Sequence, residues 1–257
     1  MLVVVSPAKK LDESLKTRGL PVTQPDFIPE TQELLEVAQE LTRPDLKRLM
    51  GISDALAELN YERYRAFDFP FAEHNASAAA FMFRGDTYTG LDADSLSDEE
   101  LLYAQGHLRI LSGLYGILRP LDLMQPYRLE MGTRLSNPVG EDLYDYWGTR
   151  LADHLSADLE GHAAQVVINC ASNEYFKAAN EKAIRGTVIT PVFKEEKDGI
   201  AKIVSFSAKR ARGMMARYII QNRIEQPEDI RAFTEGGYKF QPEQSDQTTY
   251  IFTRPKA

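Results

Sequence analysis

Two short polar segments follow apolar runs typical of buried strands, and both carry side chains suited to ligand binding or catalysis. Residues 6–10 read Ser-Pro-Ala-Lys-Lys and come directly after the β-branched run Leu2–Val5. Residues 169–177 read Asn-Cys-Ala-Ser-Asn-Glu-Tyr-Phe-Lys and follow the apolar run Val166–Ile168. Loops that leave strand ends commonly form ligand sites in open sheets. The two segments are therefore candidates for one shared pocket, with two separate polar turns as the alternative.

The first segment allows three interpretations. Ser6 and Lys9 have the S-x-x-K spacing of serine acyl-enzymes, but the further motifs of those enzymes are absent from this sequence. A polar turn with two solvated lysines is the simplest alternative. The third interpretation is a phosphate site, in which Lys9 and Lys10 act as point charges. We favour the phosphate site.

The second segment is expected to begin a helix, with Ser172 or Asn173 as its N-cap. Free backbone N–H groups at a helix start can bind an anion. Asn169, at the strand end, and Glu174, in the first turn, are candidates to face the same cleft as the first segment. Glu174 would be a general base if burial raised its pKa. The alternative is helix capping alone, since the helix dipole favours an acidic residue at this position.

A glycine-containing segment, His107–Pro120, is the third candidate. Gly113 and Gly116 lie three residues apart among apolar residues. A helix–hairpin–helix element needs such glycines, because its tight turn adopts unusual backbone angles and approaches a phosphate closely. Arg109 and Arg119 lie nearby and would neutralise phosphates. The alternative is a helical kink packed in the core.

The predicted helix 207–221 is the fourth candidate. The chain carries no acidic residue between Gly199 and Glu225. On a helical projection the apolar side chains fall on one arc and the basic ones on the other: Lys209, Arg210, Arg212 and Arg217. Clustered Lys and Arg on one helical face are the electrostatic footprint of nucleic-acid binding. We favour an anion-binding role over a merely solvated face, which usually mixes both signs.

Bulk properties limit the remaining classes. The 257 residues have a net charge of −8, so any attraction to nucleic acid must come from a local basic cluster. One cysteine, Cys170, excludes an internal disulfide and fits a reducing cytoplasm. No apolar stretch has the length of a signal peptide or a bilayer span, so we expect a cytoplasmic protein without membrane contact. The four histidines are scattered and no metal-binding motif occurs, so we expect neither a metal site nor a cofactor.

The pattern of elements indicates a mixed fold. Apolar runs predict strands at 2–5, 165–170, 187–193, 201–206, 238–240 and 248–252. Helical spacing and caps predict helices at 29–41, 53–67, 97–111, 142–159 and 207–221. No linker or repeat divides the chain. We therefore expect an α+β (mixed α/β) fold, in which residues 1–257 form a single domain with a mixed central sheet surrounded by helices.

Several long strings in this sequence resemble the YaaA family of bacterial peroxide-stress proteins. They are Ser-Pro-Ala-Lys at 6–9, Phe-Arg-Gly-Asp-Thr-Tyr-Thr-Gly-Leu at 83–91, the stretch 108–135 with Ser-Gly-Leu-Tyr-Gly-Ile-Leu-Arg-Pro, Tyr-Asp-Tyr-Trp-Gly at 144–148, the segment 169–177, and Ala-Lys-Arg-Ala-Arg-Gly-Met-Met-Ala-Arg-Tyr-Ile at 208–219. Cys170 stands where a leucine is expected, and Arg84 where lysine is common. The resemblance runs through nearly the whole chain.

This resemblance implies a role in surviving hydrogen peroxide, by limiting free intracellular iron and the DNA damage that iron causes. It also implies DNA binding and a helix–hairpin–helix element within a positively charged cleft. Carried over to this sequence, the candidate DNA contacts are Lys9, Lys10, Arg109, Gly113, Gly116, Arg119, Lys209, Arg210, Arg212 and Arg217.

Three functional hypotheses follow. The first is a DNA-binding stress protein whose partner is double- or single-stranded DNA, held mostly by phosphate contacts. The second is an enzyme acting on a nucleotide or damaged nucleobase at a pocket formed by the loops 6–9 and 169–177, with a small nucleotide-like ligand and the candidate catalytic residues Ser6, Lys9, Asn169, Ser172 and Glu174. The third, a non-enzymatic iron-handling factor, is disfavoured because ligand side chains are not clustered. Whether the protein is an enzyme stays open.

Overall fold

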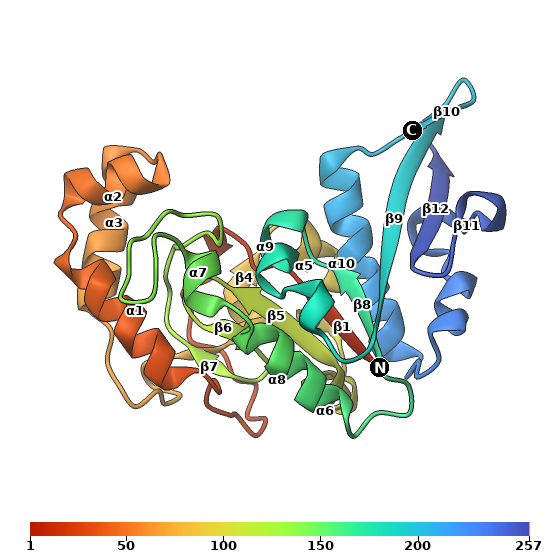
Figure 1. Ribbon diagram of the computed structural model, residues 1–257. Helices are drawn as coiled ribbons and strands as arrows, with labels where there is room; N and C mark the ends of the chain where they lie inside the picture. Colours follow the sequence, from red (N-terminus) through yellow and green to blue (C-terminus); the bar gives the residue numbers. More distant parts are fainter. Residues whose placement is uncertain (257) are drawn as a thin grey trace.

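The computed structural model describes residues 1–256 and centres on a mixed eight-stranded sheet. The strand order is β11-β12-β9-β8-β1-β5-β6, and β10 pairs with β9 (Figure 1). Its middle strands are β8 (Val166–Cys170), β1 (Leu2–Val5) and β5 (Leu108–Ser112), and they run parallel. Every residue of these three strands is buried, as expected of parallel strands covered on both faces.

Shorter or edge strands complete the sheet and two small ladders. The remaining strands of the main sheet are β6 (Gly116–Leu118), β9 (Thr187–Lys197), β10 (Ile200–Lys202), β11 (Lys239–Phe240) and β12 (Thr249–Pro255). Two antiparallel ladders pair β2 (Lys10–Leu11) with β4 (Phe83–Arg84), and β3 (Ser77–Ala78) with β7 (Leu123–Met124). The first ladder continues the segment that leaves β1.

Helices surround the sheet. The α-helices are α1 (Ile28–Glu40), α2 (Arg43–Met50), α3 (Asp54–Arg65), α4 (Ala79–Met82), α5 (Asp86–Leu91), α6 (Asp98–His107), α7 (Leu143–Trp147), α8 (Arg150–Leu159), α9 (Asn173–Ala178) and α10 (Ser205–Gln221). Short 3₁₀ turns occur at Ala93–Ser95, Glu181–Ala183, Pro227–Ala232, Glu235–Gly237 and Pro242–Gln244. Within residues 1–256, no helix combines the length and the apolar character required to cross a membrane.

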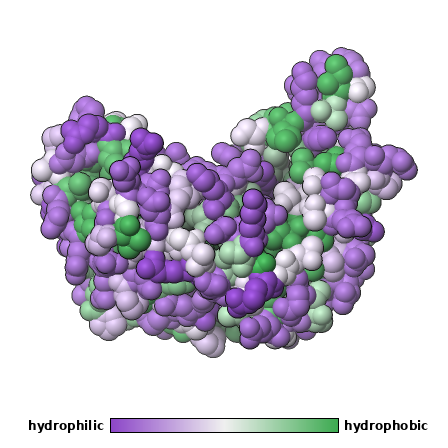
Figure 2. Space-filling view, viewed as in Figure 1, coloured by the Kyte–Doolittle hydropathy of each residue, from purple (hydrophilic) through white to green (hydrophobic). Residues whose placement is uncertain are grey.

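The molecule is hollowed on one side. A lobe of α1, α2 and α3 stands at one end, and an arm formed by the end of β9 and by β10 projects at the other (Figure 1). The space-filling view shows a concave surface between this lobe and the arm (Figure 2). The exposed surface on both sides of the hollow is largely hydrophilic.

The order of the parallel strands creates a topological switch point. From β1 the chain next enters the sheet at β5, on one side of β1, whereas from β8 it continues to β9, on the opposite side. The loops that leave β1 and β8 therefore diverge at the carboxyl ends of two adjacent strands. A crevice at such a point is the usual ligand position in open α/β sheets.

The predicted fold class is confirmed. The expected strands at 2–5 and 165–170 correspond to β1 and β8, and the late strand pair corresponds to β11 and β12. Ser53 and Ser97 cap α3 and α6, and Ser97 forms the expected capping box with Glu100. These elements carry strong local signals, namely apolar runs and hydroxyl caps.

The helix–hairpin–helix prediction is wrong for the segment expected to contain it. Helix α6 ends at His107, and the following residues form the antiparallel hairpin of β5 and β6. A Cβ at Gly113 would lie 2.3 Å from the carbonyl oxygen of Leu129, and one at Gly116 would lie 2.8 Å from the ring of Trp147. Both glycines are buried and allow close packing of the core.

Two further boundaries differ from the predictions. The helix expected over 142–159 is interrupted at Gly148, whose φ of +51° separates α7 from α8. The strand expected over 201–206 is shorter, because β10 ends at Lys202 and α10 already begins at Ser205. The β-branched and aromatic residues of 203–206 are typical of a strand, but Ile203 and Phe206 are exposed rather than paired in the sheet.

Candidate functional site

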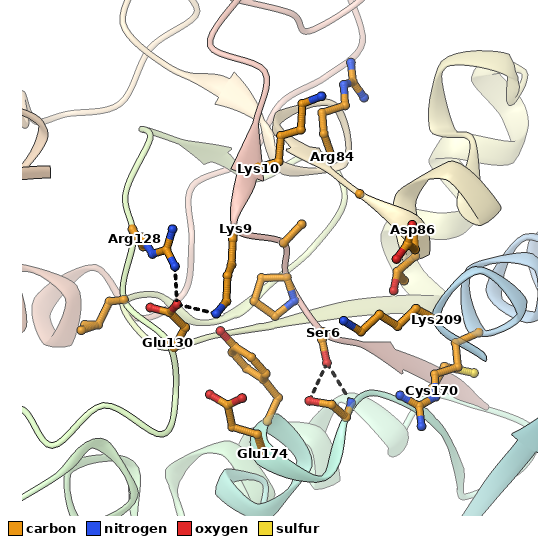
Figure 3. Close-up of a pocket in the computed structure, with 18 of the residues that line it drawn as sticks. Ser6, Lys9, Lys10, Arg84, Asp86, Arg128, Glu130, Cys170, Glu174 and Lys209 are labelled. Atoms are coloured by element: carbon orange, nitrogen blue, oxygen red, sulfur yellow. Dashed lines mark hydrogen bonds and ion pairs between the residues drawn. The ribbon is translucent and has the colours of Figure 1, made fainter. Parts of the chain in front are cut away.

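A cavity of about 480 Å³ lies at the carboxyl ends of β1 and β8, and we call it the strand-end pocket. Both polar segments identified in the sequence contribute to its lining, through Ser6, Lys9 and Lys10 on one side and through Ser172 and Glu174 on the other (Figure 3). The expectation that these segments share a pocket is therefore confirmed. Adjacent parallel strands end at the same edge of a sheet, which explains why residues 166 positions apart meet there.

Ser6 and Ser172 join the two loops directly. The Ser172 backbone N–H donates to the Ser6 Oγ at 2.8 Å, and the Ser6 hydroxyl donates to the Ser172 Oγ at 3.3 Å. The Tyr88 hydroxyl donates to the Ser6 carbonyl oxygen at 3.1 Å. Among residues 1–256, no lysine, histidine or carboxylate lies within hydrogen-bonding distance of the Ser6 hydroxyl. Ser6 thus fixes the loops, and the acyl-enzyme arrangement with Lys9 is not formed.

Basic side chains outnumber acidic ones in the lining of the strand-end pocket. The basic residues are Lys9, Lys10, Arg84, Arg128, Lys209 and Arg212, and the acidic residues are Asp86, Glu130 and Glu174. Six positive charges therefore face three negative ones. An excess of one sign in a concave, partly apolar site attracts ions of the opposite sign.

Half of these cations have acidic partners. Lys9 and Arg128 each approach Glu130 Oε1 at 2.9 Å. Arg84 contacts Asp12 at 2.8 Å and Asp94 at 3.2 Å. Within residues 1–256, no ion pair is formed by the other three cations, which are Lys10, Lys209 and Arg212. These three charges are available to an anionic ligand.

Glu130 remains ionised within this basic surrounding. Its burial raises the pKa of the carboxyl, but the hydrogen bond from Lys9 and the charge of Arg128 outweigh burial, so the pKa lies below its usual range. The other carboxylate oxygen, Oε2, is buried without a hydrogen-bond partner in the part of the chain that the structure describes. Glu130 therefore neutralises part of the positive charge in the pocket.

Close helix packing places Lys209 and Arg212 at the pocket. A Cβ at Gly213 of α10 would lie 1.8 Å from the carbonyl oxygen of Thr87, and one at Gly90 of α5 would lie 2.0 Å from that of Arg210. The two glycines thus allow the backbones of α5 and α10 to touch. This contact brings the first half of α10 beside the first turn of α5, where Asp86 and Thr87 line the pocket.

Two of the candidate catalytic residues have other surroundings than expected. The Asn169 side chain points away from the strand-end pocket: it accepts from the Ala171 N–H at 3.0 Å and donates to Thr190 Oγ1 at 3.3 Å. It lines a separate, open cleft beside β9. Glu174 lines the strand-end pocket but is exposed and accepts from the Gly132 N–H at 3.0 Å. The burial on which its role as a general base depends is absent.

Cys170 borders the pocket, but its thiol is buried and unreactive. Burial raises the pKa of its thiol to about 12. The reactive form of cysteine is the thiolate, so this side chain is protonated at neutral pH and is a poor nucleophile.

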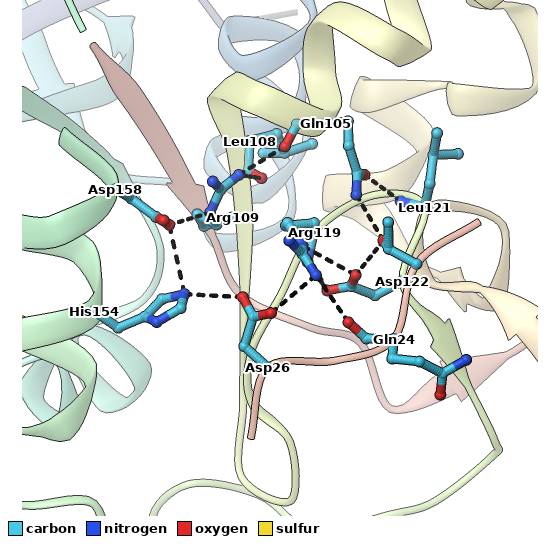
Figure 4. A network of polar contacts seen from close by, with 11 residues as sticks. Gln24, Asp26, Gln105, Leu108, Arg109, Arg119, Leu121, Asp122, His154 and Asp158 are labelled. Carbon is cyan, nitrogen blue, oxygen red and sulfur yellow. Dashed lines mark hydrogen bonds and ion pairs between the residues drawn. The ribbon is translucent and has the colours of Figure 1, made fainter. Parts of the chain in front are cut away.

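Two arginines predicted to contact DNA, Arg109 and Arg119, instead form ion pairs within the protein itself. Arg109 is 5% exposed, pairs with Asp158 at 2.6 Å and donates to backbone carbonyl oxygens, so the prediction for this residue is wrong. Arg119 pairs with Asp26 and Asp122, each at 3.0 Å. These contacts form one network, which also contains His154 (Figure 4).

The basic residues of α10 also divide into two groups. Lys209 and Arg212 line the strand-end pocket, and Arg210 is exposed next to them. Arg217 instead donates to the carbonyl oxygens of Leu91 and Asp92, at 3.0 and 2.8 Å, and so satisfies the carboxyl end of α5. Arg217 thus has a structural function in the folded protein.

Several pocket residues are not among the candidates that the sequence indicates. Arg84 and Asp86 lie in the family string 83–91, which follows no predicted strand end. Arg128 and Glu130 lie in a loop without a strand-end or helix-start pattern, so no local signal indicates them. Among residues 1–256, no group of three or more His, Cys, Asp or Glu side chains is arranged to hold a metal ion.

Comparison with known proteins agrees with the long motifs. A family model described as "Peroxide stress protein YaaA" matches residues 1–244. The chain belongs to this family. Similar proteins include a UPF0246 protein of Magnetococcus marinus, 54% identical over 257 residues and the full length of both chains. UPF0246 proteins of Hahella chejuensis and Dinoroseobacter shibae are 53% and 52% identical, over 99% of this chain and over 99% and 95% of theirs. The family description supports the expected role in peroxide stress.

Proposed function

We propose that this peroxide stress protein binds DNA, with the strand-end pocket contacting the phosphate backbone. The observation that carries the proposal is the convergence of Lys10, Lys209 and Arg212 in one pocket without ion-pair partners among residues 1–256. These residues come from segments about 200 positions apart in the chain, so their meeting is a property of the fold. Lysine and arginine at such a concave site are the usual phosphate ligands.

The distribution of charge explains how an acidic protein can bind an acidic polymer. The net charge of −8 repels DNA at long range, but salt screens this repulsion beyond about 8–10 Å. The pocket acts at short range, where its unpaired cations contact phosphates and displace condensed counterions. Binding should therefore be local, modest in strength and strongly dependent on salt.

Charge reversal at two positions tests the proposal. Fluorescence anisotropy with a labelled oligonucleotide should show binding at low salt, with an affinity that falls as salt rises. The double variant Lys209→Glu/Arg212→Glu should weaken binding at least about tenfold and reduce the slope of log affinity against log salt by about 2, since each lost phosphate contact removes about 0.9.

The matched control is Lys239→Glu. Lys239 is exposed on β11, at the edge of the sheet away from the pocket. Its substitution by glutamate changes the net charge of the protein by the same amount as each of the two pocket substitutions. If the control weakens binding per charge as much as the double variant, the effect is one of total charge and the proposed site is wrong. Absence of binding by the unmodified protein at low salt would contradict DNA binding altogether.

The proposal includes the link to lower free intracellular iron that the resemblance to the YaaA family implies. In bacterial cells challenged with hydrogen peroxide, removal of this protein should raise both chelatable iron, measured by electron paramagnetic resonance, and DNA breaks. Cells that produce only the Lys209→Glu/Arg212→Glu variant separate the two effects, because loss of DNA contact should raise DNA breaks even where iron is unchanged.

A second candidate function is an enzyme acting on a nucleotide or a damaged nucleobase. It is favoured by the convergence of four candidate catalytic residues, Ser6, Lys9, Ser172 and Glu174, in one cavity of about 480 Å³, a size that suits a small ligand. A direct test incubates the protein with nucleoside mono-, di- and triphosphates and with oligonucleotides containing oxidised bases. Turnover that Lys9→Ala abolishes would support it, and turnover in none of these mixtures would contradict it.

A further inference from the structure

The strand-end pocket contains two carboxylates that the fold leaves without cationic partners. Asp86, the first residue of α5, and Glu174, in the first turn of α9, both line the pocket from exposed positions (Figure 3). Among residues 1–256 neither forms an ion pair, although Glu174 accepts a hydrogen bond from the Gly132 N–H. The third carboxylate of the lining, Glu130, is held by two cations. The helix dipole favours an acidic residue at each helix start, and both charges still face a ligand that enters the pocket.

These carboxylates disfavour a ligand that consists of DNA backbone alone. The backbone of DNA carries phosphate and ether oxygens but no N–H or O–H group, and the Watson–Crick donors of the bases are already paired in a duplex. A ligand that displaces water from the pocket must therefore supply hydrogen-bond donors to Asp86 and Glu174, because a carboxylate deprived of both water and a partner is strongly unfavourable. The pocket suits an anion that also brings donor groups.

The cations that would hold this anion lie at the same strand ends. Lys209 and Arg212 are three residues apart on α10, a spacing that places them on one helical face. Figure 3 shows the Lys209 side chain extending toward Ser6. Burial raises the pKa of the Cys170 thiol to about 12, and the nearby Arg212 guanidinium opposes this effect. Together with Lys10, three cations and two carboxylates without ion-pair partners among residues 1–256 thus share one pocket.

Apolar side chains complete the lining. Leu129 and Tyr175 are buried, Pro7 is half-buried, and all three form part of the pocket wall. Proteins that take a base out of the DNA stack bind it by hydrogen bonds to its edge and by contacts between its faces and aromatic or apolar side chains. A nucleotide with an unpaired base combines a phosphate, free donor groups and apolar faces. A cavity of about 480 Å³ has the size of a small-ligand site and cannot admit a duplex.

We propose that the strand-end pocket holds a single unpaired nucleotide of DNA, whose phosphates contact Lys209 and Arg212 and whose base donates hydrogen bonds to Asp86 and Glu174. The protein should therefore bind DNA with an extruded base more tightly than a fully paired duplex. This inference rests on the proposed DNA binding and specifies its ligand. The amino group of cytosine is a suitable donor, because Asp and Glu accept from it in known modes of base recognition.

The first experiment changes the ligand without changing its charge. Anisotropy titrations use three labelled duplexes of equal length: one fully paired, one with a single unpaired cytosine, and one with an abasic nucleotide at the same position. The duplex with the unpaired cytosine should bind at least about fivefold more tightly than the other two, because only its base offers donors to the carboxylates. Deoxycytidine monophosphate should displace it only at much higher concentration. Displacement at equal concentration would show that the ligand is a free nucleotide and that the DNA part of the inference is wrong.

The second experiment removes the two carboxylate charges at nearly constant side-chain size. The double variant Asp86→Asn/Glu174→Gln keeps an acceptor for the Gly132 N–H. It should bind the fully paired duplex more tightly, because repulsion of phosphate is lost, while its preference for the unpaired cytosine should fall severalfold. The matched control is Glu228→Gln/Asp229→Asn, at two exposed positions of the 3₁₀ turn Pro227–Ala232 outside the pocket lining. This control should retain the full preference.

Two outcomes would overturn the inference and leave phosphate binding intact. One is equal affinity of the unmodified protein for the duplexes with the unpaired cytosine and with the abasic nucleotide. The other is a gain in affinity by the same factor for all three duplexes in the double variant of Asp86 and Glu174, which would show that these carboxylates only repel phosphate. Failure of the unmodified protein to bind any of the duplexes at low salt would instead contradict the proposed function.

Discussion

Glu130 provides the sharpest test of the charge balance in the strand-end pocket. Its carboxylate holds Lys9 and Arg128 at 2.9 Å each. The variant Glu130→Gln keeps the size of the side chain and removes its charge, which raises the number of pocket cations without an acidic partner from three to five. If the pocket binds phosphates, the variant should bind DNA more tightly than the unmodified protein. The slope of log affinity against log salt should steepen by up to about 1.8, or 0.9 for each released cation.

The same substitution should lower stability. Charge-assisted hydrogen bonds contribute about 1.5–3 kcal/mol each when buried, but Lys9 is mostly exposed, and its contribution is reduced by solvent screening. We expect a loss of about 1–3 kcal/mol in the free energy of unfolding, which corresponds to roughly 2–10 °C in Tm for a chain of this size. Thermal unfolding followed by circular dichroism measures this change.

The pH dependence gives an independent check. The pKa of Glu130 is lowered in the folded protein, so its ion pairs stabilise the fold fully above the carboxyl's unfolded pKa of about 4.3. This contribution is lost as pH falls through the folded value. The difference in stability between the unmodified protein and Glu130→Gln should therefore be largest near neutral pH and shrink in acid.

The binding experiment has a clear refuting outcome. If folded Glu130→Gln binds DNA more weakly than the unmodified protein at every salt concentration, the strand-end pocket does not bind phosphate.

Two further predictions concern helix packing and the thiol. Gly213→Ala should be destabilising, because about 1–3 kcal/mol of overpacking against the Thr87 carbonyl exceeds a gain in helix propensity of about 1 kcal/mol. Gly106→Ala is the control: its Cβ would meet no atom within 4 Å, so this variant should raise Tm slightly. Equal shifts of Tm in the two variants would contradict the close contact at Gly213. Cys170, whose thiol pKa is raised to about 12, should resist peroxide and alkylation in the native protein and react only after unfolding, as intact mass measures; rapid native labelling would show that the thiol is accessible.

Local sequence signals predicted much of the sheet and the caps but not the hairpin of β5 and β6. The apolar run of β1 and the hydroxyl caps Ser53 and Ser97 act within a few residues, so the structure follows them. After His107 the sequence contains no glycine or proline stop signal for several residues, and its apolar spacing is compatible with a helix. The segment after His107 forms strand β5 because Leu108 pairs with Val3 of β1. This contact joins residues more than 100 positions apart, so no local pattern predicts it.

For the site, the order of residues along the chain is enough to predict that polar loops follow two buried strands and that one acid-free helix carries a cluster of positive charge. Which basic residues remain available to a ligand depends on the folded arrangement. Arg109 and Arg119 are neutralised by Asp158 and by Asp26, which lie 49 and 93 positions away in the chain. Lys209 and Arg212 have no such partner within residues 1–256. The physical reason is that a side-chain charge is neutralised by an opposite charge that the fold places within a few ångströms of it. The separation of two residues along the chain does not give their distance in space.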